Sequence, residues 1–193
     1  MKIILASASP RRRELLSEVI ENFEIKVSET DENLDSSVHP RDGVRILSER
    51  KGRAVLDTLS EEEQKNCVVI SSDTLVEIFD KPLGKPDSEQ QAHEMLRILS
   101  GKRHNVHTGI ALHYQGKVYS GTATTGVVFK ELTDREIDEY IATGEPMDKA
   151  GSYGIQGLGG KFVTEIYGDF DTVVGFSIKL LKELFALAGI NID

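Results

Sequence analysis

Three consecutive arginines stand at the start of a predicted helix near the beginning of the chain. Arg11, Arg12 and Arg13 follow Ser9 and Pro10, which are residue types favoured at the N-cap and first position of a helix. The amino end of a helix carries partial positive charge, so three cations there are unfavourable unless an anion binds. Backbone N–H groups and guanidinium forks together would bind a phosphate. The alternative is a solvent-exposed basic helix start with Ser9 as a simple cap.

An acidic residue follows the most apolar strand-like segment of the sequence. Asp73 and Thr74 come after the run Cys67–Ile70 and two serines. A carboxylate at the carboxyl end of a buried strand lies where α/β sheets bind ligands, and it can hold a divalent metal or accept a proton from water. The alternative is a turn-forming Asp. We expect a second extended segment at Leu75–Phe79 and a turn at residues 80–82.

Two lysines are further candidate cations. Lys51 lies on the apolar stripe of a helix predicted over Val44–Val55, and Lys85 lies in the short segment Gly84-Lys85-Pro86. From position alone, Lys51 is expected to cover the core with its stem while its ammonium reaches water. Position alone also favours an exposed turn for Lys85. The functional alternative is that both ammonium groups point into a binding cleft.

A glycine-rich segment, predicted to be largely loop, covers Glu145–Gly160. Glycines let a backbone pass close to a ligand, and the amide of Gln156 can both donate to and accept from a base edge. A plain surface loop is the alternative, although long ordered loops are often functional.

Composition excludes several classes of protein. The chain has 193 residues, a formal net charge of −9 and one cysteine. A disulfide-stapled module is excluded, and an acidic chain is unsuited to binding a nucleic-acid polymer. No apolar run is long enough for a membrane span, and the first apolar stretch is too short for a signal peptide, so we expect a cytoplasmic protein that does not bind membranes. His104 and His107 are predicted to point to opposite faces of a strand, which argues against a shared metal.

Alternating strand and helix patterns predict an α/β fold. A long hairpin predicted over Val106–Phe129, turning at residues 115–116, argues against a purely parallel sheet. We therefore expect a mixed, partly antiparallel twisted sheet with flanking helices. Glu61–Glu63 is interpreted as an exposed charged run. No separable linker is present, and residues 1–193 are expected to form one domain.

Five motifs together resemble those of a known family. They are Ser7-Ala8-Ser9-Pro10-Arg11-Arg12, Asp73-Thr74, Leu83-Gly84-Lys85-Pro86, Leu99-Ser100-Gly101 and the segment Gly144–Gly157. In this order they resemble the Maf-type nucleoside triphosphate pyrophosphatases over essentially the whole chain, and the last segment resembles the dTTP/UTP branch. The resemblance implies a fold similar to inosine-triphosphate pyrophosphatases, with two lobes around a deep cleft, and often a homodimer. One departure is Ser71-Ser72, where the family usually has Gly-Ala.

The resemblance also implies roles for individual residues. It assigns binding of the substrate phosphates to Ser9, Arg11, Arg12, Lys51 and Lys85. It assigns the choice of substrate to Arg12, Thr74 and Gln156. Asp73 matches the proton acceptor, and Asp73 and Glu32 would hold Mg²⁺ or Mn²⁺.

The hypothesis that follows is hydrolysis of dTTP or UTP, or of a modified pyrimidine triphosphate. Water would attack the α-phosphorus, giving the monophosphate and pyrophosphate with a divalent metal. One alternative is a non-catalytic nucleotide-binding regulator of cell division or septum formation, which would keep the cations and could spare Asp73. Another is a phosphatase that releases orthophosphate. A protein-interaction module would leave the arginine triplet unexplained.

Overall fold

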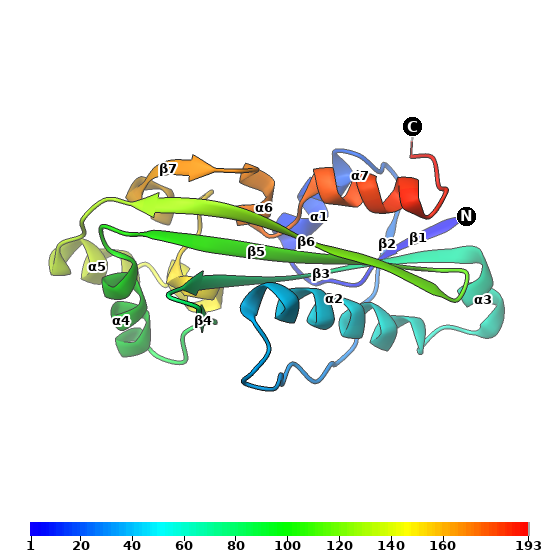
Figure 1. The fold of residues 1–193 in the computed structure, drawn as a ribbon, viewed down its shortest axis with the longest axis horizontal. Helices are drawn as coiled ribbons and strands as arrows, with labels where there is room; N and C mark the ends of the chain where they lie inside the picture. Colours follow the sequence, from blue (N-terminus) through cyan, green and yellow to red (C-terminus); the bar gives the residue numbers. More distant parts are fainter. Residues whose placement is uncertain (193) are drawn as a thin grey trace. The chain divides into compact units, whose positions relative to one another are not determined.

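The computed structural model describes residues 1–192 and contains a seven-stranded mixed sheet flanked by helices (Figure 1). The strand order is β2-β1-β3-β5-β6-β7, and β4 pairs with β3. The expected mixed α/β class is therefore confirmed. No helix among the described residues is long and apolar enough to cross a membrane.

The elements have the following bounds. The strands are β1 (Lys2–Leu5), β2 (Glu24–Ile25), β3 (Cys67–Ile78), β4 (Lys81–Leu83), β5 (Arg103–Tyr114), β6 (Lys117–Phe129) and β7 (Val163–Tyr167). The α-helices are α1 (Pro10–Ser17), α2 (Pro40–Leu56), α3 (Glu61–Asn66), α4 (Glu89–Leu99), α5 (Asp134–Ile141), α6 (Phe170–Val174) and α7 (Ile178–Leu187). Short 3₁₀ turns cover Glu145–Asp148, Ala150–Ser152 and Leu158–Phe162.

The chain divides into two compact units, each built from several segments. The first contains Met1–Asp73, Thr108–Ala123 and the described residues from Gly175 onward. The second contains Thr74–His107 and Thr124–Val174. The division falls within β3, β5 and β6, so each of these strands contributes residues to both units.

The first unit has parallel strands at its centre. β1 pairs in parallel with β2 on one side and with β3 on the other. Because the chain passes from β1 to β2 and then back across to β3, the strand order reverses at β1. In open α/β sheets such a reversal opens a crevice at the carboxyl ends of the strands, where ligands bind.

Helices cover both faces of the sheet in this unit. α2 lies on one side, and α1 and α7 lie on the other (Figure 1). α2 packs so closely on β5 that a Cβ at Gly109 would lie 2.2 Å from the Val44 carbonyl oxygen. A buried apolar cluster joins β1, β3 and the end of α2, and it consists of Ile4, Ala6, Val55, Leu56, Leu59, Cys67 and Val69.

The second unit has its own core between its strands and the helices α4 and α5. The largest buried side chains of this core are Tyr140, Phe129 and Phe162. Phe129 makes edge contacts with Phe162 and Tyr153. A reciprocal capping box of Thr133 and Glu136 starts α5.

Two local predictions were wrong. β3 runs without interruption through Asp73 to Ile78, and the turn falls at Phe79 and Asp80, so that Lys81–Leu83 forms β4. Both turn residues have positive φ, 54° and 59°, in a turn that usually selects Gly or Asn. The Glu77 carboxylate closes this turn by accepting from the Asp80 N–H at 3.0 Å, a side-chain contact that composition alone does not reveal.

The charged run Glu61–Glu63 is also more than an exposed surface segment. It forms the first turn of α3, which Ser60 and Glu63 start with a reciprocal capping box. Acidic residues are favoured at a helix amino end, so the run is a helix start.

His104 should make stability sensitive to acid. Its ring is 2% exposed, and its Nε2 lies 2.8 Å from the Tyr153 hydroxyl. Burial lowers the pKa of His104 from 6.5 to about 4, opposed in part by the backbone at Lys102. The unfolded chain therefore binds this proton more readily. We expect the contribution to be complete above about pH 6.5 and to fall by about 3 kcal/mol as the pH approaches about 4.

Urea unfolding at pH 7 and pH 4.5 tests this expectation. His104→Gln should lose less stability than the wild-type protein over this interval. Part of the loss should remain, because burial also lowers the pKa of His113. An unchanged acid loss in His104→Gln would show that this histidine is not responsible.

Candidate active site

Arg12 is fixed just after the carboxyl end of β1 and beside the middle of β3. Its Nε donates to the Gly175 carbonyl at 2.9 Å, and its Nη1 donates to the Ser72 carbonyl at 2.8 Å and to Ser7 Oγ at 3.4 Å. Burial lowers the pKa of Arg12, while the charge of Asp73 acts in the opposite direction. An arginine stays charged at neutral pH despite such a shift. The Arg12 guanidinium is therefore held against the backbone of Ser72, the residue that precedes Asp73.

Lys51 joins two carboxylates. Its Nζ lies 2.5 Å from Asp73 Oδ1 and 2.7 Å from Glu32 Oε1. The side chains of Lys51 and Asp73 are only 20% and 10% exposed, so little water screens this pair. The expectation from helix position alone, that the ammonium simply reaches water, is wrong. The ammonium instead joins α2, β3 and the loop before α2.

The loop that carries Glu32 is held by the residue before Lys51. Arg50 Nη1 donates to the Asn33 carbonyl at 2.7 Å and to the Asp31 carbonyl at 3.3 Å. Asp31 Oδ1 in turn accepts from the Asn33 backbone N–H at 2.9 Å. The hydrogen bonds from the backbone and the side chain of Asn33 lower the pKa of Asp31. Adjacent residues of α2 thus bind the loop backbone and the Glu32 side chain.

Ser9 and Arg11 lie at the start of α1, as predicted. Ser9 is the N-cap residue, but its side chain makes no capping hydrogen bond, so its expected role as a cap is not realised. Its backbone N–H donates to Ser7 Oγ at 3.3 Å. No acidic residue stands in the first turn of this helix, which leaves Arg11, Arg12 and Arg13 as the charged residues there.

The remaining predicted residues belong to the second unit. Thr74 follows Asp73 directly in β3. Lys85 and Gln156 are both exposed, and the segments that carry them are joined, because the Gly151 N–H donates to the Gly84 carbonyl at 3.0 Å. The structure thus brings together Arg12, Glu32, Lys51 and Asp73 in one unit, and links the segments of Lys85 and Gln156 in the other.

Glu145 organises the backbone on both sides of Gln156. This role of Glu145 was not predicted from the sequence. Its carboxylate accepts from the Tyr140 hydroxyl at 2.8 Å and from the N–H groups of Leu158 and Gly159 at 2.9 and 3.1 Å. The Tyr140 hydroxyl also accepts from the Gly154 N–H at 3.1 Å. Burial opposes ionisation of Glu145, but these hydrogen bonds hold its pKa below the ordinary value.

Gly157 explains part of this close arrangement. A Cβ at residue 157 would lie 2.5 Å from Glu145 Oε1, so only glycine lets the backbone pass the carboxylate. The available sequence signal was the glycine itself, next to Gln156. A second anchor that was missed is the Gly175 carbonyl, which holds Arg12 and has no recognisable motif around it.

The donor set suits a hard divalent cation. Among residues 1–192 no group of three or more His, Cys, Asp or Glu side chains could form a complete metal site. Asp73 and Glu32 nevertheless bring two carboxylates to one cation, the Lys51 ammonium. Mg²⁺ commonly takes one or two carboxylates and fills its remaining positions with substrate phosphates and water. The two carboxylates fit an ion of this kind.

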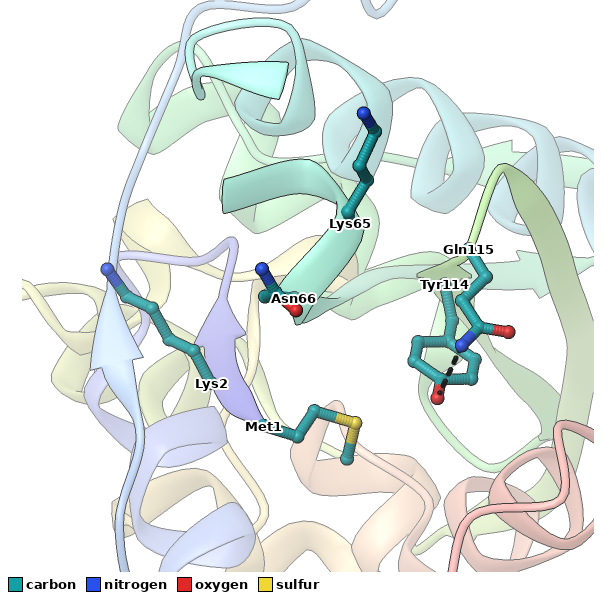
Figure 2. Close-up of a pocket in the computed structure, with 6 residues that line it drawn as sticks. All are labelled: Met1, Lys2, Lys65, Asn66, Tyr114 and Gln115. Atoms are coloured by element: carbon teal, nitrogen blue, oxygen red, sulfur yellow. Dashed lines mark hydrogen bonds between the residues drawn. The ribbon is translucent and has the colours of Figure 1, made fainter. Parts of the chain in front are cut away.

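A separate hollow in the first unit lies elsewhere. Figure 2 shows it lined by Met1, Lys2, Lys65, Asn66, Tyr114 and Gln115. Lys2 begins β1 and Asn66 precedes β3, so this hollow lies at the amino ends of the two parallel strands. Ligand sites of such sheets lie at the opposite ends, and none of the predicted site residues lines the hollow.

Comparison with known proteins decides the family. The family model described as "Maf-like protein" matches residues 2–188. The chain belongs to the Maf family. This agrees with the resemblance carried by the five sequence motifs, which the matched range includes.

Two relatives of this Maf protein share a name that states an activity. A protein of Bacillus cereus (strain B4264), named "dTTP/UTP pyrophosphatase", is 47% identical over 184 residues, covering 95% of this chain and 94% of the relative. A protein of Thermococcus kodakarensis with the same name is 47% identical over 182 residues, covering 94% of each chain. A solved structure of the Staphylococcus aureus Ham1 protein has a TM-score of 0.52 and 16% identity, covering 98% of this chain and 99% of that one. This last likeness shows the fold alone.

The Glu145 arrangement gives a prediction for this Maf protein. Glu145→Ala removes the acceptor of three hydrogen bonds, so we expect a loss of about 1–3 kcal/mol in local stability. Hydrogen exchange followed by mass spectrometry should show faster exchange in residues 154–159. Glu139→Ala, which removes an exposed ion pair with Arg135, should leave this segment protected. Equal exchange rates in both variants would contradict the role of Glu145.

Proposed function

We propose that this Maf protein hydrolyses dTTP and UTP to the monophosphate and pyrophosphate. The observation that carries the proposal is the Lys51–Asp73 contact of 2.5 Å beside the fixed guanidinium of Arg12. Paired cations and a carboxylate are what hydrolysis of a phosphoric anhydride requires. The names of relatives that are 47% identical over most of the chain support the same substrates.

The phosphate-binding roles follow from charge and position. Arg12 offers a guanidinium that Gly175 and Ser72 hold in place, and Arg11 and Ser9 belong to the same helix start. Oxygens of the triphosphate would also contact Lys51, whose ammonium lies next to Asp73. We assign Lys85 to the phosphates as well, on the ground of its motif. Positioned cations stabilise the charge that builds up on the leaving pyrophosphate.

Asp73 is the group proposed to act on water. Its carboxylate is 10% exposed and is held by Lys51, so it can orient a water molecule and accept its proton. The water then attacks the α-phosphorus, the bond from this phosphorus to the bridging oxygen breaks, and pyrophosphate leaves with that oxygen. Positioning of the water against the phosphorus supplies much of the acceleration.

Asp73 and Glu32 are the residues that would hold Mg²⁺ or Mn²⁺. Such an ion supplies neutralisation of charge on the phosphate oxygens. In the free protein Lys51 contacts both carboxylates. With such an ion held by the two carboxylates, the Lys51 ammonium would be available to the phosphate oxygens of the substrate. The positive charge of Lys51 would thus balance the carboxylates in the free protein and the substrate in the complex.

Choice of the base is assigned to Arg12, Thr74 and Gln156. Thr74 is the residue next to Asp73, and Gln156 lies in the segment that Glu145 holds. An exposed amide can donate to and accept from the edge of uracil or thymine. Action in the cytoplasm, assembly as a homodimer and lack of binding to nucleic-acid polymers remain predictions from the sequence.

A panel of nucleoside triphosphates tests the proposed function. The wild-type protein with Mg²⁺ should release pyrophosphate from dTTP and UTP and not from purine triphosphates, and EDTA should abolish the release. Orthophosphate as the direct product would favour the phosphatase alternative. Nucleotide binding without any product would favour the non-catalytic regulator.

Asp73→Asn tests the chemical role directly. The amide keeps the size of the side chain but cannot accept the proton, so kcat should fall about 10²–10⁴-fold. Binding of dTTP, measured by calorimetry, should persist because the cations remain. Asp57→Asn, which changes an exposed carboxylate paired with Arg53, should keep wild-type kcat. A fully active Asp73→Asn protein would remove this residue from the chemistry.

A further inference from the structure

Two buried serines precede Asp73, and each bonds to a different element of the site. Ser71 and Ser72 are both 0% exposed. Successive side chains of a strand point to opposite faces, so Ser71 faces α2, as Asp73 does, and Ser72 faces the other side. We propose that both are positioning residues for the proposed reaction, Ser71 by setting Lys51 against Asp73 and Ser72 by setting Arg12. The inference rests on the proposed function.

Ser71 connects β3 to α2 just before Lys51. Its Oγ donates to the Ser48 carbonyl at 2.6 Å, and the Ala111 carbonyl lies at 3.4 Å. Ser48 is three residues before Lys51 on α2, and Ser71 is two residues before Asp73 on β3. The buried hydrogen bond therefore joins the two elements that carry the ammonium and the carboxylate.

Gly52 provides the second contact, on the other side of Lys51. A Cβ at residue 52 would lie 2.6 Å from Ser71 Oγ and 2.5 Å from His113 Cδ2. The helix backbone thus approaches the Ser71 side chain as closely as a glycine allows. With contacts at Ser48 and Gly52, Ser71 fixes α2 on both sides of Lys51, whose Nζ then lies 2.5 Å from Asp73 Oδ1.

Ser72 donates a hydrogen bond to the Gly175 carbonyl, which also accepts a hydrogen bond from Arg12. Its Oγ donates to the Gly175 carbonyl at 3.1 Å, and Arg12 Nε donates to the same oxygen at 2.9 Å. The backbone carbonyl of Ser72 also accepts from Arg12 Nη1 at 2.8 Å. The contacts of the guanidinium with Gly175 and with Ser72 therefore both depend on Ser72.

The two serines should affect different kinetic parameters. Ser71→Ala loosens Lys51 against the group that acts on water, so we expect kcat for dTTP to fall about ten-fold with KM within about two-fold. Ser72→Ala loosens a phosphate-binding guanidinium, so KM should rise about ten-fold with kcat within about two-fold. Both are measured with saturating Mg²⁺, on protein whose folding is confirmed by thermal melting.

Ser48→Ala is the matched control. Its hydroxyl is also 0% exposed and donates to the Arg45 carbonyl at 2.7 Å, while the carbonyl that Ser71 contacts remains. It should keep wild-type kcat and KM, even where its melting temperature falls as far as that of the other variants. Should Ser71→Ala not fold, Ser71→Gly deletes the same hydroxyl and should show the same fall in kcat.

The outcomes separate the inference from the proposed function. A fall mainly in kcat for Ser71→Ala, together with a rise mainly in KM for Ser72→Ala, supports the inference. Wild-type kinetics in both variants, or equal losses that follow only the melting temperature and appear in Ser48→Ala too, overturn it and leave the pyrophosphatase activity standing. A wild-type protein that releases no pyrophosphate overturns the proposed function, and the inference with it.

Discussion

The contact of one ammonium with two carboxylates is the interaction on which the proposed site depends. Lys51 lies 2.5 Å from Asp73 and 2.7 Å from Glu32, in surroundings where it is mostly shielded from water. Removing one member of such a group leaves uncompensated charge, which is costly when it is partly buried. The arrangement therefore holds the Asp73 and Glu32 carboxylates beside one ammonium.

The fold places these charges through its strand order. β1 lies between β2 and β3 in the sheet. In the chain, α1 follows β1, while α2 and then α3 precede β3. Arg12 therefore comes from the helix on one face and Lys51 from the helix on the other, while Asp73 lies on the strand between them. Ser71 and Ser72, pointing to opposite faces, hydrogen-bond to one side each.

Sequence alone was informative where chemistry is local. The arginine triplet depends on neighbours in the chain, and the structure has it at the predicted helix start. Asp73, in contrast, lies inside β3 and not after its end. The Lys51 interpretation failed because helix periodicity does not tell which carboxylate lies across from a side chain. The Phe79–Asp80 turn was missed for a similar reason, since the Glu77 carboxylate that closes it acts in place of a turn-forming sequence. Gly175 accepts through its backbone carbonyl and Glu145 through a carboxylate that binds distant backbone N–H groups, and neither pairing follows from a sequence motif.

A crystal structure with Mg²⁺ and the α,β-imido analogue of dTTP, which cannot be cleaved at the scissile bond, would test the central claim most directly. The account predicts phosphate oxygens in contact with the Lys51 ammonium and the Arg12 guanidinium, and the metal bound to the Asp73 carboxylate. A triphosphate bound elsewhere, with the Lys51–Asp73 contact unchanged and untouched by ligand or metal, would contradict it.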